Sequence, residues 1–163
     1  MTCLVADSGP LIALAKLGHL DLPARLYGRA ILPRTVFTEC VTEAHRPDAE
    51  AIRQAVDAGW LEVVDDVAWP AQVGKPRLDP GESAALAMAL VSGASLLIDE
   101  QRGRKAARRL GVRVVGVLGL LLLAKQAGHL DAVAPALERL NAERYFISRA
   151  LCADVLGMAG EIP

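Results

Sequence analysis

The sequence contains few aromatic residues and few cysteines, and both shortages narrow what the protein can be. Aromatic side chains make up 4% of the 163 residues while 53% are hydrophobic, so the core must consist mainly of Leu, Val, Ile and Ala. The three cysteines, Cys3, Cys40 and Cys152, are odd in number, far apart and without a C-x-x-C pair. This usage argues against a disulfide framework and indicates reduced thiols in a cytoplasmic protein.

Long apolar runs are also missing. The most apolar stretch, GVLGLLLLA at residues 116–124, is far shorter than the roughly 20 residues that cross a bilayer, and it predicts a buried helix. The first residues, MTCLVADSGP, lack the basic segment and apolar run of a signal peptide. We therefore expect a cytoplasmic protein with no membrane partner.

An excess of basic charge is absent as well, since 18 Lys and Arg residues stand against 19 Asp and Glu residues. A protein that binds nucleic acid through bulk charge would be more basic, so any such binding must depend on local patches or bound cations. The three histidines are scattered, which disfavours a zinc site. The sequence also lacks serine-hydrolase, P-loop and dinucleotide-binding motifs.

What the sequence does contain is a regular alternation of short apolar segments and helical segments. Strands are predicted at residues 3–6, 30–32, 60–64, 95–99 and 112–116. Helices are predicted at residues 11–20, 21–27, 34–44, 48–58, 82–93, 101–111, 117–127, 130–142 and 147–159. For the first of these helices, Ser8 is the expected N-cap, and Asp79-Pro80-Gly81 forms the expected turn and cap before the helix at 82–93.

This alternation predicts an α/β fold with a mostly parallel central sheet, and strands that are apolar on both faces predict helices on both sides. We expect a three-layer α/β/α domain with four to five short strands. Residues 65–77 are the only stretch that resembles a long loop, and no linker is long enough to divide domains. The whole chain, 1–163, is therefore predicted to be one domain, with a helical C-terminal extension at 129–161 packed on it.

Acidic residues stand where two of these strands end. Asp7 follows the first strand, and Asp99 and Glu100 follow the fourth, while Glu39 and Glu82 belong to helices. In open α/β sheets, functional groups gather beyond the carboxyl ends of the strands. Clustered carboxylates repel one another, and a divalent metal relieves that repulsion. Oxygen-only ligation suits Mg²⁺ or Mn²⁺.

Each acid also has a purely structural interpretation. Asp7 and Asp99 could cap the helices that follow them, and Glu39 could be a solvated helix residue. Glu82 lies at a helix N-terminus, where a negative charge is favoured by roughly 0.3–1 kcal/mol. Taken singly, Glu39 and Glu82 are most simply explained in this way. The combination of the four acids is what favours a metal site.

Basic residues follow the fourth strand closely. Arg102, Arg104 and Lys105 lie on the predicted helix just beyond Asp99, where one helix face can border the acidic site and contact phosphates. The alternative is a solvated helix face. Ser8 is placed similarly: a helix cap is the simpler role, and contact with the substrate is the other.

Four stretches together resemble a known family. They are VADSGPLIALAKLG at 5–18, LPRTVFTECV at 32–41, LDPGESAALAMAL at 78–90 and LLIDEQRGRKAARRLGVRVVGVLGLLLLAKQAG at 96–128. Their order and spacing resemble those of PIN-domain proteins, of the kind found as toxins in bacterial and archaeal toxin–antitoxin pairs. More narrowly, the chain resembles a PIN-like subfamily, otherwise left as a domain of unknown function, whose acidic strand ends in an Asp-Glu pair.

The resemblance implies a ribonuclease that depends on Mg²⁺ or Mn²⁺. The implied catalytic and metal-binding residues are Asp7, Glu39, Glu82 and Asp99, with Glu100 as a fifth candidate ligand. The implied substrate contacts are Ser8, Arg102, Arg104 and Lys105. The third acid departs from the pattern of many PIN domains, which carry an Asp in a different helix start where this chain has Glu82. A small antitoxin and a second copy of the chain are the implied partners besides RNA.

Two other functions remain open at this stage. One is a catalytically silent PIN-like module that binds RNA or protein. The other, which the sequence disfavours, is an α/β phosphatase or phosphotransfer domain that also uses a strand-end Asp. A phosphatase of the haloacid-dehalogenase type would carry a second acid at position 9, where this chain has Gly9, and a receiver domain would carry adjacent acids where Ala6 precedes Asp7.

Overall fold

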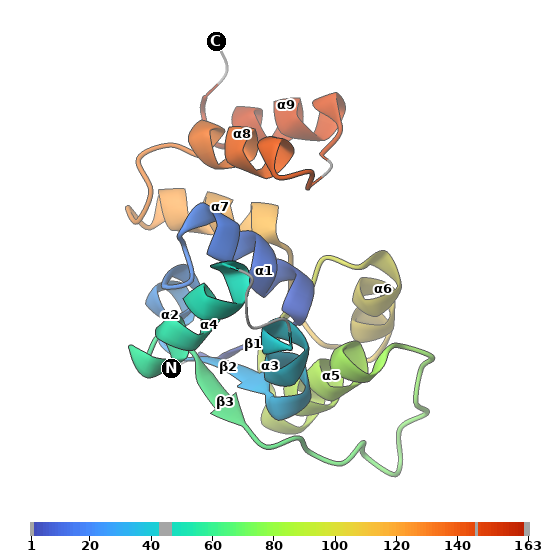
Figure 1. Cartoon of the computed structure of the whole chain (residues 1–163). Helices are drawn as coiled ribbons and strands as arrows, with labels where there is room; N and C mark the ends of the chain where they lie inside the picture. The colour runs from blue at the N-terminus through green and yellow to red at the C-terminus, as the bar shows by residue number, and fades with distance from the viewer. Residues whose placement is uncertain (1, 43–46, 146, 162–163) are drawn as a thin grey trace.

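A single parallel sheet forms the centre of the protein (Figure 1). The computed structural model describes residues 2–42, 47–145 and 147–161. Within these ranges the strands are β1 (Leu4–Ala6), β2 (Ala30–Pro33), β3 (Glu62–Val64), β4 (Ser95–Leu97) and β5 (Val114–Val115). Their order is β3-β2-β1-β4-β5, so β1 is central, and each neighbouring pair is parallel. The predicted α/β class and the predicted parallel sheet are confirmed.

The helices account for the rest of the regular structure. They are α1 (Ser8–Leu17), α2 (Leu22–Tyr27), α3 (Arg34–Val41), α4 (Pro47–Asp57), α5 (Pro80–Ser92), α6 (Gln101–Arg109), α7 (Val117–Gln126), α8 (Ala134–Ala142) and α9 (Arg149–Met158). Each corresponds to a predicted helix with ends shifted by a few residues. Residues 43 and 44, where the predicted third helix ends, lie outside the described ranges.

Sheet order decides which helices share a face. The connections from β1 to β2 and from β2 to β3 move along the sheet toward the edge formed by β3. The connections from β3 to β4 and from β4 to β5 move toward the opposite edge, formed by β5. Right-handed crossovers therefore place α1 to α4 on one face and α5 and α6 on the opposite face. Helix α5 contacts β1, β2 and β4, and α1 contacts α3 and α4. The sheet is the middle layer of three.

The central strands are buried because aliphatic side chains cover both of their faces. Leu4, Val5, Leu96 and Leu97 are inaccessible to solvent, and Ile98 continues the buried run past the end of β4. Burying a side chain of this size contributes about 1.5–3 kcal/mol, and this burial keeps the ends of β1 and β4 in place. Register pairs Val5 with Leu96 and Ala6 with Leu97, so the two strands end at the same edge.

The starts of two helices distinguish between the alternatives that the sequence left open. Asp7, not Ser8, is the N-cap of α1, because Asp7 keeps extended backbone angles and Ser8 is already helical. The Asp7 side chain makes no capping hydrogen bond. Glu100, not Asp99, is the N-cap of α6, and its carboxylate accepts from the Gly103 amide at 2.8 Å. Asp7 therefore occupies a cap position without using its carboxylate for the cap, and Asp99 is not a cap residue at all.

The helices of the C-terminal segment pack on other helices. Helix α8 contacts α1, α9 contacts α7, and Figure 1 shows both at the end of the molecule away from β3. Glu161 anchors this segment, since its carboxylate accepts from the amides of Val133 (2.7 Å) and Ala134 (3.0 Å) and from Lys125 (2.9 Å). Among the described residues, no helix has the length and apolar character to span a membrane.

Candidate active site

Asp7 lies at the carboxyl end of the central strand and is the most buried acid of the cluster. Its side chain belongs to a residue that is only 6% exposed, and its Oδ1 has no hydrogen-bond partner. The Asp7 amide donates to the Leu97 carbonyl at 3.0 Å, which fixes the residue between β1 and β4. Burial raises the pKa of Asp7 to about 6, and repulsion by Asp79, Glu39 and Asp99 adds to the shift. A buried hydrogen-bond acceptor without a partner lowers the stability of the folded state. The stability of the fold therefore does not explain why an aspartate occupies position 7.

Glu39 reaches the same region from α3. A hypothetical Cβ on Gly81 would lie 2.6 Å from Glu39 Oε1, so the start of α5 approaches the carboxylate more closely than any side chain at position 81 allows. Desolvation and the charge of Asp79 raise the pKa of Glu39, while hydrogen bonds from the Ser8 hydroxyl and the Gly81 amide act in the opposite direction. Glu39 is exposed at the surface of α3, so its carboxylate can move.

Glu82 enters from the first turn of α5 and is buried. Asp79 is the N-cap of this helix, and its Oδ1 accepts from the Glu82 amide at 2.8 Å. Burial raises the pKa of Glu82 to about 8, and contact with Asp79 and the charges of Asp7 and Glu100 add to the shift. Asp79 thus interacts with three of the predicted site acids although the sequence interpretation gave it only a capping role.

Asp99 follows β4 and is held from two sides. Its Oδ1 accepts from the Val117 amide at 3.0 Å, and its Oδ2 accepts from the Tyr145 hydroxyl. A Cβ on Gly116 would lie 2.5 Å from Asp99 Oδ1, so this glycine leaves the space that the carboxylate occupies. Burial and the contact with Asp99 raise the pKa of Tyr145, which keeps its hydroxyl a donor.

The other predicted residues have different surroundings. Glu100 is exposed and caps α6, although its charge still acts on Glu82. Arg104 is half-buried, and its Nη1 donates to the Ile98 carbonyl at 2.8 Å. This hydrogen bond gives the side chain a structural role at the end of β4. Arg102 and Lys105 are exposed on α6. Their side chains make no hydrogen bond or ion pair with another residue in the described ranges.

The geometry places four predicted acids around the carboxyl ends of β1 and β4, and the comparison with known families shows which family this fold belongs to. A family model described as a PIN domain matches residues 3–161. The chain belongs to the PIN-domain family. Its described fold is therefore that of a nuclease-type domain, and the match extends over the helical segment at 129–161.

One solved structure has the same fold as this PIN domain. It is a PilT N-terminus domain protein from the hyperthermophilic archaeon Sulfolobus solfataricus P2, which superposes with a TM-score of 0.51. The alignment covers 74% of this chain and 90% of the other at 20% sequence identity, so the likeness shows the fold alone. No curated protein matches this sequence.

The donors of this PIN domain fit a divalent cation in their chemistry. All are carboxylates, and Asp7 Oδ1 is a buried acceptor without a partner. Burial, and to a smaller extent repulsion by neighbouring acids, raises the pKa of Asp7, Glu39 and Glu82, and a bound cation would favour their charged forms. Within the described part of the chain, no three His, Cys, Asp or Glu side chains form a ready-made metal site. Binding would therefore draw the acids together, and the exposed Glu39 has the freedom to move.

Sequence reasoning overlooked three contributors to this region. Asp79 had a recognisable signal, because an acid three positions before Glu82 forms a capping pattern that puts both carboxylates at one helix end. Gly116 and Tyr145 had none. Tyr145 is 46 positions from Asp99, and only the packing of the C-terminal segment brings the two together.

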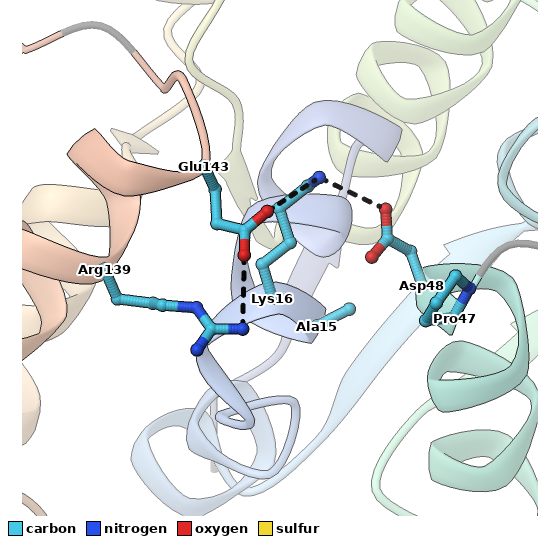
Figure 2. A pocket seen from close by; sticks show the side chains of 6 residues that line it. All are labelled: Ala15, Lys16, Pro47, Asp48, Arg139 and Glu143. Atoms are coloured by element: carbon cyan, nitrogen blue, oxygen red, sulfur yellow. Dashed lines mark ion pairs between the residues drawn. The ribbon is translucent and has the colours of Figure 1, made fainter.

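A separate hollow of about 530 Å³ lies away from these acids (Figure 2). Figure 2 shows its charged residues paired with one another. Lys16 is 3.5 Å from Asp48 and 3.8 Å from Glu143, and Arg139 is 3.1 Å from Glu143. These ion pairs connect α1 and α4 to the end of α8, so the hollow is a structural junction of the C-terminal segment.

Proposed function

We propose that this PIN domain is a metal-dependent ribonuclease that hydrolyses phosphodiester bonds in RNA with Mg²⁺ or Mn²⁺. The observation that carries the proposal is Asp7, a buried carboxylate at the end of the central strand with one oxygen unpartnered and three further acids acting on it. If no ligand bound here, the folded protein would be more stable with an uncharged side chain at position 7. A cation bound by the Asp7 carboxylate explains why a charged residue is present.

In this proposal the acids have different tasks. Asp7, Glu39, Glu82 and Asp99 would hold the ion, which lowers the pKa of water and screens the phosphate when it is bound. Asp7 is rigid because its backbone joins β1 to β4, whereas Glu39 is free to adjust. Glu100 caps α6 and contributes charge from the edge of the cluster.

Substrate contact falls to the exposed cations of α6. Arg102 and Lys105 can meet RNA phosphates beside the acids, and phosphate contacts of this kind position a nucleic acid without reading its sequence. Arg104 supports the end of β4 through the Ile98 carbonyl. Ser8 lies in the first turn of α1, and its hydroxyl acts on Glu39.

The cellular role that we propose is the toxin of a type II toxin–antitoxin pair, acting in the cytoplasm as a homodimer and inhibited by a small antitoxin. The support is the PIN-domain family, together with the resemblance of the sequence to PIN toxins. Expression of the chain in a bacterial host should arrest growth, and co-expression of a small protein encoded beside it should restore growth if that protein is the antitoxin. Growth that continues unchanged contradicts the toxin role and leaves the nuclease proposal intact.

The nuclease proposal is tested by incubating purified protein with single-stranded RNA in Mg²⁺, in Mn²⁺ and in EDTA. Cleavage is expected only with the ions. Asp7→Asn and Asp99→Asn should each abolish it, while circular dichroism shows that the variants stay folded. If the wild type binds RNA without cutting it under any condition, the protein is a binding module and the enzymatic proposal is wrong.

A further inference from the structure

Tyr145 connects the C-terminal helices to the acid cluster. Its hydroxyl donates to Asp99 Oδ2 across 46 positions of sequence, while the Val117 amide donates to Oδ1 at 3.0 Å. Each carboxylate oxygen has two acceptor sites. The two donors occupy one site on each oxygen, so the others remain available to a cation. A carboxylate held on both oxygens cannot rotate without losing a hydrogen bond.

The turn that presents Tyr145 is well defined. Helix α8 ends in a motif in which the Arg144 amide donates to the Asn141 carbonyl (3.2 Å) and the Tyr145 amide donates to the Leu140 carbonyl (2.9 Å). The residue at the bend, Arg144, has a φ of +62°, a left-handed conformation that this motif usually assigns to glycine. The turn sets the direction in which Tyr145 leaves the helix.

Ion pairs anchor the same turn to the rest of the domain. Glu143, two residues before Tyr145, lies 3.8 Å from Lys16 of α1 and 3.1 Å from Arg139 of α8 (Figure 2). At the other end of the segment, Glu161 binds Lys125 of α7. Tyr145 is thus carried by a segment that is attached to α1 and α7, the helices that follow β1 and β5.

We infer that Tyr145 is a positioning residue, which holds the Asp99 carboxylate in the orientation that meets the divalent cation. The helical segment at 129–161 is then a part of the site and more than a covering of the domain. This inference rests on the proposed metal-dependent function. It assigns Tyr145 a role through Asp99 and no contact with RNA.

The test is the Mn²⁺ affinity of the full chain, measured by calorimetry without RNA. Tyr145→Phe removes only the hydroxyl and should weaken Mn²⁺ binding by about 10–100-fold, the usual effect of losing a partner that orients a ligand. The melting temperature should stay within about 3 °C of the wild type, since one hydrogen bond contributes about 1 kcal/mol. Tyr27→Phe is the matched control, because Tyr27 is half-buried on α2, and its Mn²⁺ affinity should be unchanged.

A double-mutant cycle with Asp99→Asn separates positioning from a general structural effect. If Tyr145 acts through Asp99, then adding Tyr145→Phe to Asp99→Asn should change Mn²⁺ affinity by less than about twofold. An equal loss in both backgrounds would overturn the inference, as would unchanged or tighter binding in Tyr145→Phe alone. Tighter binding would mean that the hydroxyl competes with the cation. If the wild type binds no Mn²⁺, the proposed function and this inference are both wrong.

Discussion

Gly81 lies so close to Glu39 that a Cβ at position 81 would be 2.6 Å from Glu39 Oε1 and 2.7 Å from its Cδ. The start of α5 and the side face of α3 therefore meet through a glycine backbone and a carboxylate. The Gly81 amide also favours the charged form of Glu39, because its hydrogen bond lowers the pKa of the carboxyl group. The close contact means that a single methyl group can disturb the site from the backbone side.

Gly81→Ala should displace the Glu39 carboxylate while leaving the fold in place. The added methyl meets the end of a flexible, exposed side chain, so stability should change by less than about 1 kcal/mol. RNA cleavage should fall by up to about 100-fold, as expected when a reacting group is misplaced by about 1 Å. Gly74→Ala is the control, since nothing lies within 4 Å of its Cβ position. Full activity in Gly81→Ala would show that RNA cleavage does not depend on the position of the Glu39 carboxylate.

Asp7→Asn should stabilise the protein when no metal is present. The pKa of Asp7 is raised to about 6, so the folded state holds the proton more tightly than the unfolded chain. The stability gained from protonation is complete below about pH 4 and is lost as the pH rises through about 6. Removing the charge should raise the free energy of unfolding by about 1–3 kcal/mol at pH 8 and by little at pH 4.

Urea unfolding in EDTA at both pH values measures this difference. Asp154→Asn, which removes an exposed charge within α9, is the control and should show no such dependence on pH. A destabilised Asp7→Asn at pH 8 would mean that the charge of Asp7 is compensated within the folded protein.

Mn²⁺ should stabilise the wild type against heat. A ligand at about 100 times its Kd contributes about 2.7 kcal/mol, which raises the melting temperature of a domain of this size by about 5–10 °C. The gain should be larger at pH 8 than at pH 5, because protons compete for the acids. EDTA should reverse it, and Asp7→Asn should abolish it. Differential scanning fluorimetry with Mn²⁺, with Ca²⁺ and with EDTA gives the comparison.

Glu161→Gln should loosen the C-terminal segment. Hydrogen bonds from Val133, Lys125 and Ala134 lower the pKa of Glu161 to about 2. Its stabilising contribution is therefore present above about pH 4.5 and is lost as the pH falls through about 2. The melting temperatures of wild type and variant should differ at pH 7 and converge as the pH approaches 2. Glu138→Gln, an exposed change on α8, should have no effect, and equal behaviour of the two variants would contradict the anchoring role.

Arg102 and Arg104 should respond differently to substitution although they are two positions apart. Arg102→Ala should weaken RNA binding and reduce the slope of log K against log salt by about 1, with stability unchanged. Arg104→Ala should lower the free energy of unfolding by about 1 kcal/mol or more, because the Ile98 carbonyl loses its donor. Filter binding at several salt concentrations and urea unfolding measure the two effects. If Arg104→Ala instead weakened RNA binding and Arg102→Ala instead lowered stability, Arg104 would be the RNA contact and Arg102 the structural residue.

The periodicity of the sequence was sufficient to predict the fold. Leu96, Leu97 and Ile98 form an apolar run without helical spacing, and they are buried at β4 and just beyond it, as predicted. The exact helix starts were harder, because the backbone angles of one residue decide them. Ser8 has the chemistry of an N-cap, yet the extended conformation of Asp7 makes Asp7 the cap. Such choices depend on how the end of β1 is held against β4.

By itself, the sequence determined the succession of strands and helices along the chain, the aliphatic composition of the core and the positions of the acids in the sequence. Those features follow from local patterns, which repeat within a few residues. Only the tertiary structure decided that Arg104 supports Ile98 and that Tyr145 holds Asp99. These contacts join distant segments or depend on the rotation of a single helix. They come from close packing of the whole domain, which no local pattern encodes.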